Sequence, residues 1–288
     1  MEVQPVTGVI GAEVVGADLE NLDDIEFAQI EKAFTDHLVL FFRDQKPLSP
    51  EAHVGFAKRF GPLHIHPVAP GPEGHPEIMV IHADANSKYA DGNNWHSDVS
   101  CDEYPPLGSC LQLRTLPPVG GDTLFANMYA AYETLSPMMQ DFLADKSAMH
   151  ESEHVYRGRY AERGVDDTGK IYPSAEHPVV RSHPRSGKQA LYVNPSFTTR
   201  IVGLTTAESK AVLQLLYAHQ QRPEFQVRFR WSQNAIAFWD NRCTQHFAIW
   251  DYWPHERMGH RVTVKGERPF HEDTGTVESK LRVSRRHD

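Results

Sequence analysis

Apolar and polar residues alternate most regularly between Phe225 and Trp231, where every second side chain is aromatic or aliphatic. A period of two is typical of a β-strand with one buried face. Shorter apolar runs bounded by turn residues predict further strands at Leu38–Phe42, Ile78–Ile81, Leu111–Leu113, Val179–Val180, Ala190–Val193, Ala235–Trp239 and Arg261–Val264. The 20 prolines and 19 glycines are spread along the whole chain, which favours many short strands joined by turns.

Helical spacing of apolar residues occurs in fewer segments, and most of these have a start signal of their own. A proline follows Ser49 as in a first helical turn, and Thr205 with Glu208 forms a capping box. We predict helices at Asp23–His37, from Ser49 to before Gly61, at Met128–Leu143 with a break at Ser136-Pro137, and from Thr205 to about His219. The pattern therefore predicts a mainly β fold with flanking helices.

The organisation of the chain predicts a single domain over residues 1–288, because no internal repeat and no linker rich in proline, glycine or serine interrupts it. Glu151–Glu176 is polar and lacks a clear period, which predicts a surface loop or lid. The charged segment His271–Asp288 is predicted to be a frayed tail.

Composition and charge narrow the range of functions. The chain is 40% hydrophobic and 23% charged, as in globular proteins, and its net charge of −9 argues against a nucleic-acid or anionic-membrane partner. No apolar run reaches the roughly 18–20 residues that a membrane span needs, and no basic residue precedes Lys32 as in a secretory signal. Three cysteines, never spaced as C-x-x-C, suit a reduced compartment, so we predict a cytoplasmic protein.

Histidine–x–aspartate pairs are the first candidates for chemistry, because residues i and i+2 of a strand project from one face and can bind one metal ion. Three such pairs occur, and chance alone gives about one: His82/Asp84, His96/Asp98 and His271/Asp273. The first pair fits a turn at the end of a strand, and the third lies in the charged tail. The second pair stands between turn residues and an alternating strand, and we predict it as the metal-binding pair.

A third metal ligand should come from a distant strand. The polar segment Asp240–His246 follows the apolar strand Ala235–Trp239 and ends in a histidine, so we predict His246 as this ligand. Two histidines and one carboxylate leave three of six octahedral positions open, which is typical of non-haem Fe(II) oxygenases. A zinc hydrolase is the alternative, although zinc favours a tetrahedral site with one open position.

Two arginines share one face of the last predicted strand, where Arg257, Gly259, Arg261 and Thr263 occupy alternate positions. Two guanidinium groups on an inner face would need anionic partners. Arginine binds a carboxylate through two parallel hydrogen bonds, so we predict a carboxylate clamp. The alternative is an arginine pair on an exposed face.

Several motifs in order resemble the Fe(II)/2-oxoglutarate-dependent dioxygenases of the taurine dioxygenase (TauD/TfdA) type. The matching stretches are Trp95–Val99, Gly120–Leu124, Phe197–Val202, Trp239–Arg242, Thr244–His246 and His260–Arg261. The resemblance extends from near the start of the chain to about Pro269. It implies a double-stranded β-helix, or jelly roll, which the pattern of strands and turns also favours.

The resemblance also implies the cofactors and the residues that bind them. His96, Asp98 and His246 would be the iron ligands, with 2-oxoglutarate and O2 as cosubstrates. Arg257 and Thr123 would bind the distal carboxylate of 2-oxoglutarate.

In the substrate pocket the chain departs from the taurine enzyme. The resemblance implies that His66 and Arg261 contact the anionic end of the substrate, and that Arg261 also lies near the C1 carboxylate of 2-oxoglutarate. It implies that Phe197 forms an aromatic wall, the alternative being a plain core aromatic. Three positions have smaller side chains than in the taurine enzyme, and we expect them to enlarge the far end of the pocket: Ala69, Gly92 and Cys101.

The sequence therefore predicts an Fe(II)- and 2-oxoglutarate-dependent dioxygenase that hydroxylates a C–H bond of a small organic anion. The predicted substrate is a sulfonate, taurine-like or a larger alkyl or aryl sulfonate, which would release sulfite. The alternatives are the same chemistry on a carboxylate such as an aryloxyalkanoate, or a non-catalytic or zinc-hydrolytic His/Asp/His jelly roll. A homo-oligomer is compatible with the sequence.

Overall fold

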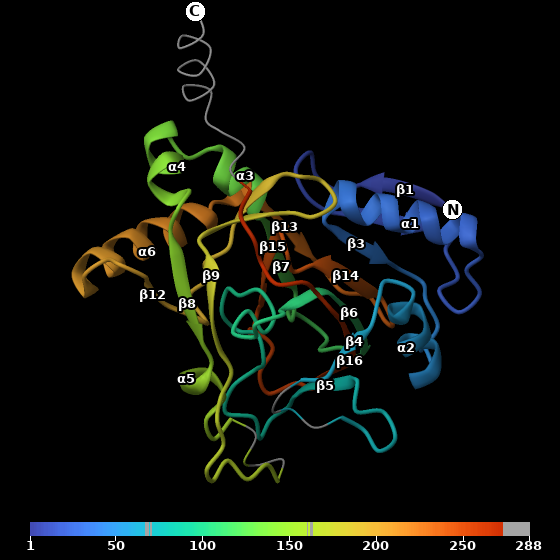
Figure 1. Ribbon diagram of the computed structural model, residues 1–288. Helices are drawn as coiled ribbons and strands as arrows, with labels where there is room; N and C mark the ends of the chain where they lie inside the picture. The colour runs from blue at the N-terminus through green and yellow to red at the C-terminus, as the bar shows by residue number, and fades with distance from the viewer. Residues whose placement is uncertain (67–68, 70, 160, 162–163, 273–288) are drawn as a thin grey trace, which may run out of the picture.

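Strands account for most of the regular structure in the computed structural model, which describes residues 1–66, 69, 71–159, 161 and 164–272 (Figure 1). The strands are β1 (Glu2–Pro5), β2 (Ala12–Val15), β3 (Val39–Phe42), β4 (Leu63–His64), β5 (Ile78–Ala83), β6 (Pro106–Thr115), β7 (Thr123–Asn127), β8 (Ser147–Glu151), β9 (Ser174–Pro178), β10 (Val180–Ser182), β11 (Gln189–Leu191), β12 (Thr198–Ile201), β13 (Gln226–Phe229), β14 (Ile236–Asp240), β15 (Thr244–Ala248) and β16 (Arg257–Lys265). The helices are α1 (Asp24–His37), α2 (Pro50–Lys58), α3 (Met128–Glu133), α4 (Pro137–Leu143), α5 (Glu153–Tyr156), α6 (Thr206–Gln220) and the 3-10 helix η2 (Pro223–Phe225). The predicted mainly β fold with flanking helices is confirmed.

Two sheets face each other across the main hydrophobic core. The larger has the order β1-β2-β3-β14-β6-β16-β4, with β5 also paired to β16, and the smaller has the order β13-β7-β15. Phe41 of β3 bridges them, because its ring stacks on Phe229 of β13 at a centroid distance of 4.1 Å. The same ring lies 5.8 Å from that of Phe125 on β7. Aromatic packing therefore joins the two sheets.

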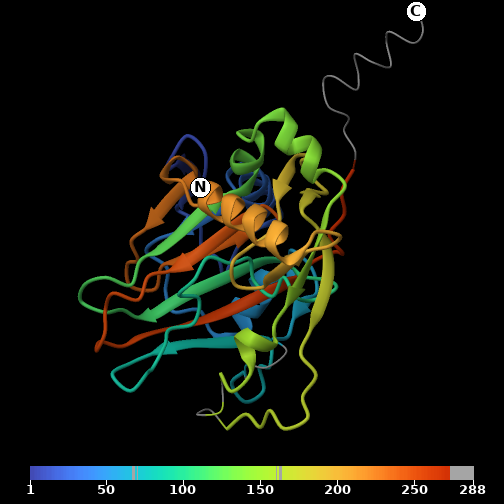
Figure 2. The ribbon, with the colours of Figure 1, turned by 90° about the vertical axis from the view of Figure 1, so that its left-hand side faces the viewer.

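Helices α1 and α2 cover the outer face of the larger sheet, and α6 lies on the opposite side of the molecule (Figures 1 and 2). Phe34 of α1 stacks on Phe238 of β14 at a centroid distance of 4.1 Å. Strand β3 is entirely apolar because Leu40 and Phe42 pack under the helices while Phe41 faces the smaller sheet. A strand that is buried on both faces has no place for a polar side chain.

The predicted helices begin where the sequence places them. Asp23 and Thr205 both form capping boxes, and the Ser49 hydroxyl accepts a hydrogen bond from the Ala52 N–H at the start of α2. The predicted break at Ser136-Pro137 separates α3 from α4. The strand predicted from Phe225 is shorter than expected, because Phe225 belongs to η2 and β13 begins one residue later.

The polar segment Glu151–Glu176 is not irregular over its whole length. Its first residue ends β8 and its last three belong to β9, and these two strands pair from Glu151↔Ser174 to Ser147↔Pro178. Helix α5 lies between them. The prediction of a loop is wrong at these ends, because β9 is an edge strand whose side chains, only one of them buried, show no apolar alternation.

Of the two other His-x-Asp pairs, the structure describes both residues of His82/Asp84 but only the histidine of His271/Asp273. His82 lies 3.2 Å from Glu256, and Asp84 accepts hydrogen bonds from the Asn86 N–H and the Ser87 hydroxyl. This pair therefore forms the predicted turn at the end of a strand. Asp273 lies outside the described residues, as does the rest of the predicted tail, residues 273–288.

The three cysteines are buried and form no disulfide bond. Within the described ranges, no helix has both the length and the apolar character needed to cross a bilayer.

Replacing Phe41 by alanine is expected to lower the free energy of unfolding by about 3–5 kcal/mol, because a fully buried ring between the sheets is exchanged for a cavity. Urea unfolding followed by circular dichroism measures the change. Ile25 on α1 is 72% exposed, so Ile25→Ala is the matched control and should change this energy by less than about 0.5 kcal/mol. A similarly small change for Phe41→Ala would show that the sheets are held together by other contacts.

Candidate metal and cosubstrate site

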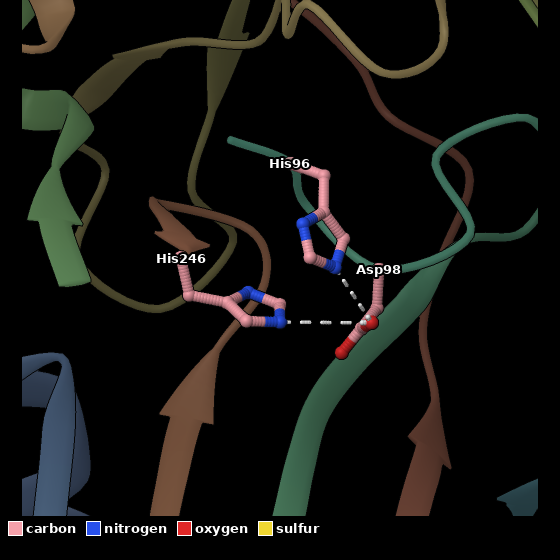
Figure 3. Close-up of side chains that lie close together, drawn as sticks. All are labelled: His96, Asp98 and His246. Atoms are coloured by element: carbon pink, nitrogen blue, oxygen red, sulfur yellow. Dashed lines mark ion pairs between the residues drawn. The ribbon is translucent and has the colours of Figure 1, made fainter. Parts of the chain in front are cut away.

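His96, Asp98 and His246 come together although His246 lies far along the chain from the other two (Figure 3). The backbones of His96 and His246 exchange two hydrogen bonds, with N···O distances of 3.1 and 2.9 Å. Asp98 Oδ1 lies 3.6 Å from His96 Nε2 and 3.9 Å from His246 Nε2. All three side chains are buried, and one ligand atom of each lies within 4.8 Å of the others.

The local structure of the first two residues differs from the predicted strand. His96 forms an isolated bridge with His246, and Asp98 lies in a turn. Asn241 holds this turn, because its side-chain oxygen accepts a hydrogen bond from the Asp98 N–H at 3.2 Å. The Asn241 carbonyl also accepts a hydrogen bond from the Ser97 hydroxyl at 2.6 Å. An anchored turn, and not a strand, therefore brings His96 and Asp98 together. The strand prediction is wrong here, and the role of the two residues as a metal-binding pair stays a prediction.

Burial and nearby charges shift the pKa values of Asp98 and His246 toward the forms that a metal binds. Burial raises the pKa of Asp98, but the charges of Arg261 and the two histidines outweigh it and hold this pKa well below its usual range. Burial, with His96 beside it, lowers the pKa of His246 well below its usual range. Nδ1 of His96 lies 2.8 Å from the Asn94 carbonyl oxygen, which can only accept, so Nε2 is left as the ligand atom. Two imidazole nitrogens and one carboxylate oxygen fit an Fe(II) ion.

A second cluster of ligand-type residues, His183, Asp240 and Cys243, offers no comparable site. Arg242 donates to both carboxylate oxygens of Asp240, at 2.9 and 2.6 Å, and His183 Nε2 lies 3.1 Å from Oδ2. Both oxygens are therefore already engaged. We interpret this buried ion pair as support for the turn that contains Asn241.

Arg257 and Arg261 point into the molecule from β16, with side chains that are buried at alternate positions. The predicted shared inner face is confirmed, and the exposed-face alternative is wrong. Arg257 Nε donates to the Gly121 carbonyl at 3.1 Å, and Nη2 donates to the Thr123 hydroxyl at 3.4 Å. Burial lowers the pKa of Arg257, and among the described residues it forms no salt bridge. A buried cation without an anionic partner is costly, so this group suits an anionic ligand.

Arg261 makes a contact that the sequence did not predict. Its Nη1 donates to Asp98 Oδ1 at 2.6 Å, the same oxygen that faces both histidines. Its Nε has no hydrogen-bond partner in the described part of the chain. The guanidinium therefore lies beside the candidate metal ligands and retains a free donor.

A cavity of about 410 Å³ adjoins the three candidate ligands. It is lined by the eight residues that the sequence predicted to bind metal, cosubstrate or substrate: His66, His96, Asp98, Thr123, Phe197, His246, Arg257 and Arg261. Met79, Ile81, Val99 and Leu111 add apolar wall. Apolar walls with a few convergent polar groups are typical of small-molecule sites.

His66 is a neutral hydrogen-bond donor in this cavity. Burial and the positive charge of Arg261 lower the pKa of His66 to about 3. Its Nδ1 accepts a hydrogen bond from the Ala69 N–H at 2.9 Å, so the ring carries its proton on Nε2. The Nε2–H group can donate to an anion without adding a charge.

Tyr156 of α5 is a wall residue that the sequence analysis missed. The centroid of its ring lies 5.3 Å from that of His66 and 5.8 Å from that of Phe197. His154, Val155 and Arg159 from the same segment also line the cavity. The segment predicted as a loop or lid therefore borders the site. A single buried aromatic among polar residues leaves no periodic signal that could have revealed it.

Of the three small residues expected to enlarge the pocket, only Gly92 is among the described residues that line it. A Cβ at Gly92 would lie 3.3 Å from Cε1 of His96, and the backbone there has a φ of 80°. Cys101 and Ala69 are buried in the hydrophobic core, and burial raises the pKa of the Cys101 thiol to about 12. Of the three small residues, therefore, only Gly92 is placed where a small side chain can widen the pocket directly.

Comparison with known proteins agrees with this geometry. The family model described as Taurine catabolism dioxygenase TauD, TfdA family, matches residues 2–263. The chain belongs to this family.

Relatives cover nearly the whole of this TauD/TfdA family member. An alpha-ketoglutarate-dependent sulfate ester dioxygenase of Pseudomonas putida is 37% identical over 278 residues, which cover 93% of this chain and 91% of the relative. An alpha-ketoglutarate-dependent sulfonate dioxygenase of Saccharomyces cerevisiae is 31% identical, with 93% of this chain and 68% of the relative covered. The crystal structure of a taurine dioxygenase from Burkholderia xenovorans has a TM-score of 0.81 and 38% identity, covering 95% of this chain and 92% of that one.

Family membership confirms the predicted resemblance and enzyme class, a 2-oxoglutarate-dependent dioxygenase. It also confirms the predicted use of Fe(II), 2-oxoglutarate and O2, because the His/Asp/His donor set that this class needs is present and buried.

Proposed function

We propose that the protein oxidises an organic anion ending in a sulfonate or sulfate ester group, by hydroxylating the carbon that bears this group. One observation carries the proposal: a single cavity joins the three candidate iron ligands, Arg257, and the pair His66 and Arg261. The sulfate ester and sulfonate relatives support this class of anion over the carboxylate alternative. Sulfate esters extend the sequence-based prediction, which named a sulfonate with a carboxylate as the alternative.

In this proposal His96, Asp98 and His246 hold Fe(II) through two nitrogens and one oxygen. Arg257 and Thr123 bind the distal carboxylate of 2-oxoglutarate, since a buried guanidinium beside a hydroxyl offers a charge and several donors. Bound iron, with O2, supplies the oxidant for C–H hydroxylation while 2-oxoglutarate becomes succinate and CO2. The protein binds and orients the reactants and excludes water.

The anionic end of the substrate lies against His66 and Arg261. Neutral His66 donates from Nε2, and Arg261 supplies positive charge together with its free Nε donor. A terminal SO3 group has three acceptor oxygens and can use both residues at once. The remainder of the substrate lies along the apolar wall, where Gly92 leaves space next to His96.

We also infer that the two facing sheets form a double-stranded β-helix and that the chain works as a single domain. Mostly antiparallel strand pairing around one cavity supports the first inference, and a family match over residues 2–263 supports the second. The three free cysteines support a cytoplasmic location.

The products distinguish this proposal from hydrolysis. Hydroxylation next to a sulfonate gives an unstable adduct that releases sulfite and leaves an aldehyde, and hydroxylation next to a sulfate ester releases sulfate and leaves the same aldehyde. A zinc hydrolase would convert the sulfate ester to an alcohol and would need neither O2 nor 2-oxoglutarate. Formation of the alcohol under anaerobic conditions would therefore contradict the proposal.

Taurine is expected to be a poorer substrate than hexanesulfonate or hexyl sulfate, by about tenfold or more in kcat/KM, because the apolar wall of Met79, Ile81, Val99 and Leu111 can bury an alkyl chain but not an ammonium group. Succinate release measures turnover, with sulfite, sulfate and aldehyde measured alongside. A highest kcat/KM for taurine would contradict the assignment of the walls, and a highest value for phenoxyacetate would favour the carboxylate alternative.

Gly92→Asn is the matched variant for this panel. Asparagine tolerates a positive φ better than most residues, and its side chain would enter the cavity beside His96. The kcat/KM ratio of hexanesulfonate to taurine should therefore fall in this variant. An unchanged ratio would show that the substrate does not pass Gly92.

A further inference from the structure

The second carboxylate oxygen of Asp98 is held by a buried serine. Ser109 on β6 is fully buried, and its hydroxyl donates to Asp98 Oδ2 at 2.7 Å. The other oxygen, Oδ1, faces both histidines and Arg261. The two oxygens of the Asp98 carboxylate therefore have different partners.

Asn241 fixes the direction of the serine hydroxyl. Its side-chain amide Nδ2 donates to Ser109 Oγ at 3.0 Å, so the single hydroxyl proton is left for Asp98. The Asn241 side-chain oxygen accepts from the Asp98 N–H at 3.2 Å and from Trp239 Nε1 at 3.0 Å, which fixes the amide in turn. The only other hydroxyl near Ser109 among the described residues is that of Thr263, at the longer distance of 3.5 Å. These contacts form a closed and fully buried set.

We propose that Ser109 is a positioning residue for the metal centre. By occupying Oδ2, it fixes the rotation of the carboxylate so that Oδ1 alone is presented to the metal. A carboxylate that binds through one oxygen leaves three positions for 2-oxoglutarate and O2, whereas one that binds through both leaves two. This inference rests on the proposed role of Asp98 as a metal ligand, but not on the identity of the substrate.

The test is metal binding by Ser109→Ala, which removes the hydroxyl and keeps nearly the same volume. Co(II) titration of the whole chain, followed by its visible absorption, is expected to show a dissociation constant about 10–100-fold higher than in the wild type. The intensity of the Co(II) bands should also change, because a freed carboxylate alters the coordination number. Ser109→Cys keeps a weak donor and should give an intermediate dissociation constant.

Thr263→Val is the matched control, because it removes the neighbouring buried hydroxyl, for which no contact to Asp98 is found in the described structure. The thermal midpoints of the metal-free variants show whether both fold comparably. The proposal is overturned if Ser109→Ala binds Co(II) as tightly as Thr263→Val does, with unchanged bands. If Ser109→Ala does not fold, the test uses Ser109→Cys instead. A Co(II) dissociation constant of Ser109→Cys equal to that of the wild type would then overturn the proposal.

The same titration separates this inference from the proposed function. Asp98→Ala should bind Co(II) more weakly than any serine variant. If Asp98→Ala binds normally, the ligand assignment has failed and the serine inference fails with it. If Asp98→Ala loses binding while Ser109→Ala keeps it, only the serine inference has failed.

Discussion

Asp98→Ala is expected to abolish 2-oxoglutarate turnover. Mutating a residue that only hydrogen-bonds to a metal ligand lowers activity by up to roughly 100-fold, and we expect the loss of Asp98 itself to exceed this. Asp98 offers the only carboxylate in the candidate ligand set, and its Oδ1 faces both histidines. Removing it leaves two imidazoles, which bind Fe(II) weakly without a charged oxygen. Succinate formation with saturating iron and substrate measures the loss.

The same substitution has an effect on stability that must be measured separately. Arg261 is buried and pairs with Asp98 at 2.6 Å, so the alanine variant retains a buried cation without this partner. Breaking one side of a buried pair costs roughly 3–5 kcal/mol. Circular dichroism at the assay temperature shows the folded fraction, and Asp98→Asn, which keeps an acceptor for Ser109, is the second variant.

Asp84→Ala is the control for the choice between the His-x-Asp pairs. Asp84 lies in a turn, and its side chain bonds only with Asn86 and Ser87 in the described part of the chain. Its loss should therefore leave turnover unchanged. Full turnover in Asp98→Ala together with loss in Asp84→Ala would move the metal site to His82 and Asp84.

The parts of the fold that could be predicted are those that local patterns control. Capping residues such as Asp23 and Thr205 act within four residues, and the apolar run of β3 reflects burial on both faces. The shared face of Arg257 and Arg261 followed from the period of a strand, because β16 is regular over that stretch. Resemblance to a family then related these residues to His66, Thr123 and Phe197, which now line one cavity.

The parts that could not be predicted depend on contacts between distant segments. Asp98 meets Arg261 and Ser109 because two strands of the larger sheet run side by side beneath its turn, and no spacing in the sequence encodes that meeting. Strand β15 was missed because apolar and polar residues do not alternate along it. Its Gln245 and His246 are buried although they are polar, and Gln245 donates a hydrogen bond to the Val193 carbonyl. Tyr156 was missed for the related reason that its packing partners lie outside its own segment.

Arg257→Ala is expected to weaken the apparent affinity for 2-oxoglutarate by roughly 2–5 kcal/mol, or about 30-fold to several-thousand-fold, because the distal carboxylate would lose its buried charged partner. Arg257→Lys should recover only part of this, since an ammonium group cannot form two parallel hydrogen bonds to a carboxylate. The KM for 2-oxoglutarate, from succinate release, measures both effects.

Thermal stability gives this prediction a second measurement and a control. Arg257 forms no salt bridge among the described residues, so its removal breaks no ion pair and should leave the thermal midpoint of the cosubstrate-free protein close to that of the wild type. The rise in midpoint caused by 2-oxoglutarate should be lost, because ligand stabilisation falls as the dissociation constant rises. Arg230, exposed on the segment that follows β13, is the matched control, and Arg230→Ala should keep both the KM and the rise. Equal KM values in Arg257→Ala and Arg230→Ala would mean that another group binds the distal carboxylate, and the buried charge on β16 would then need a different anion as its partner.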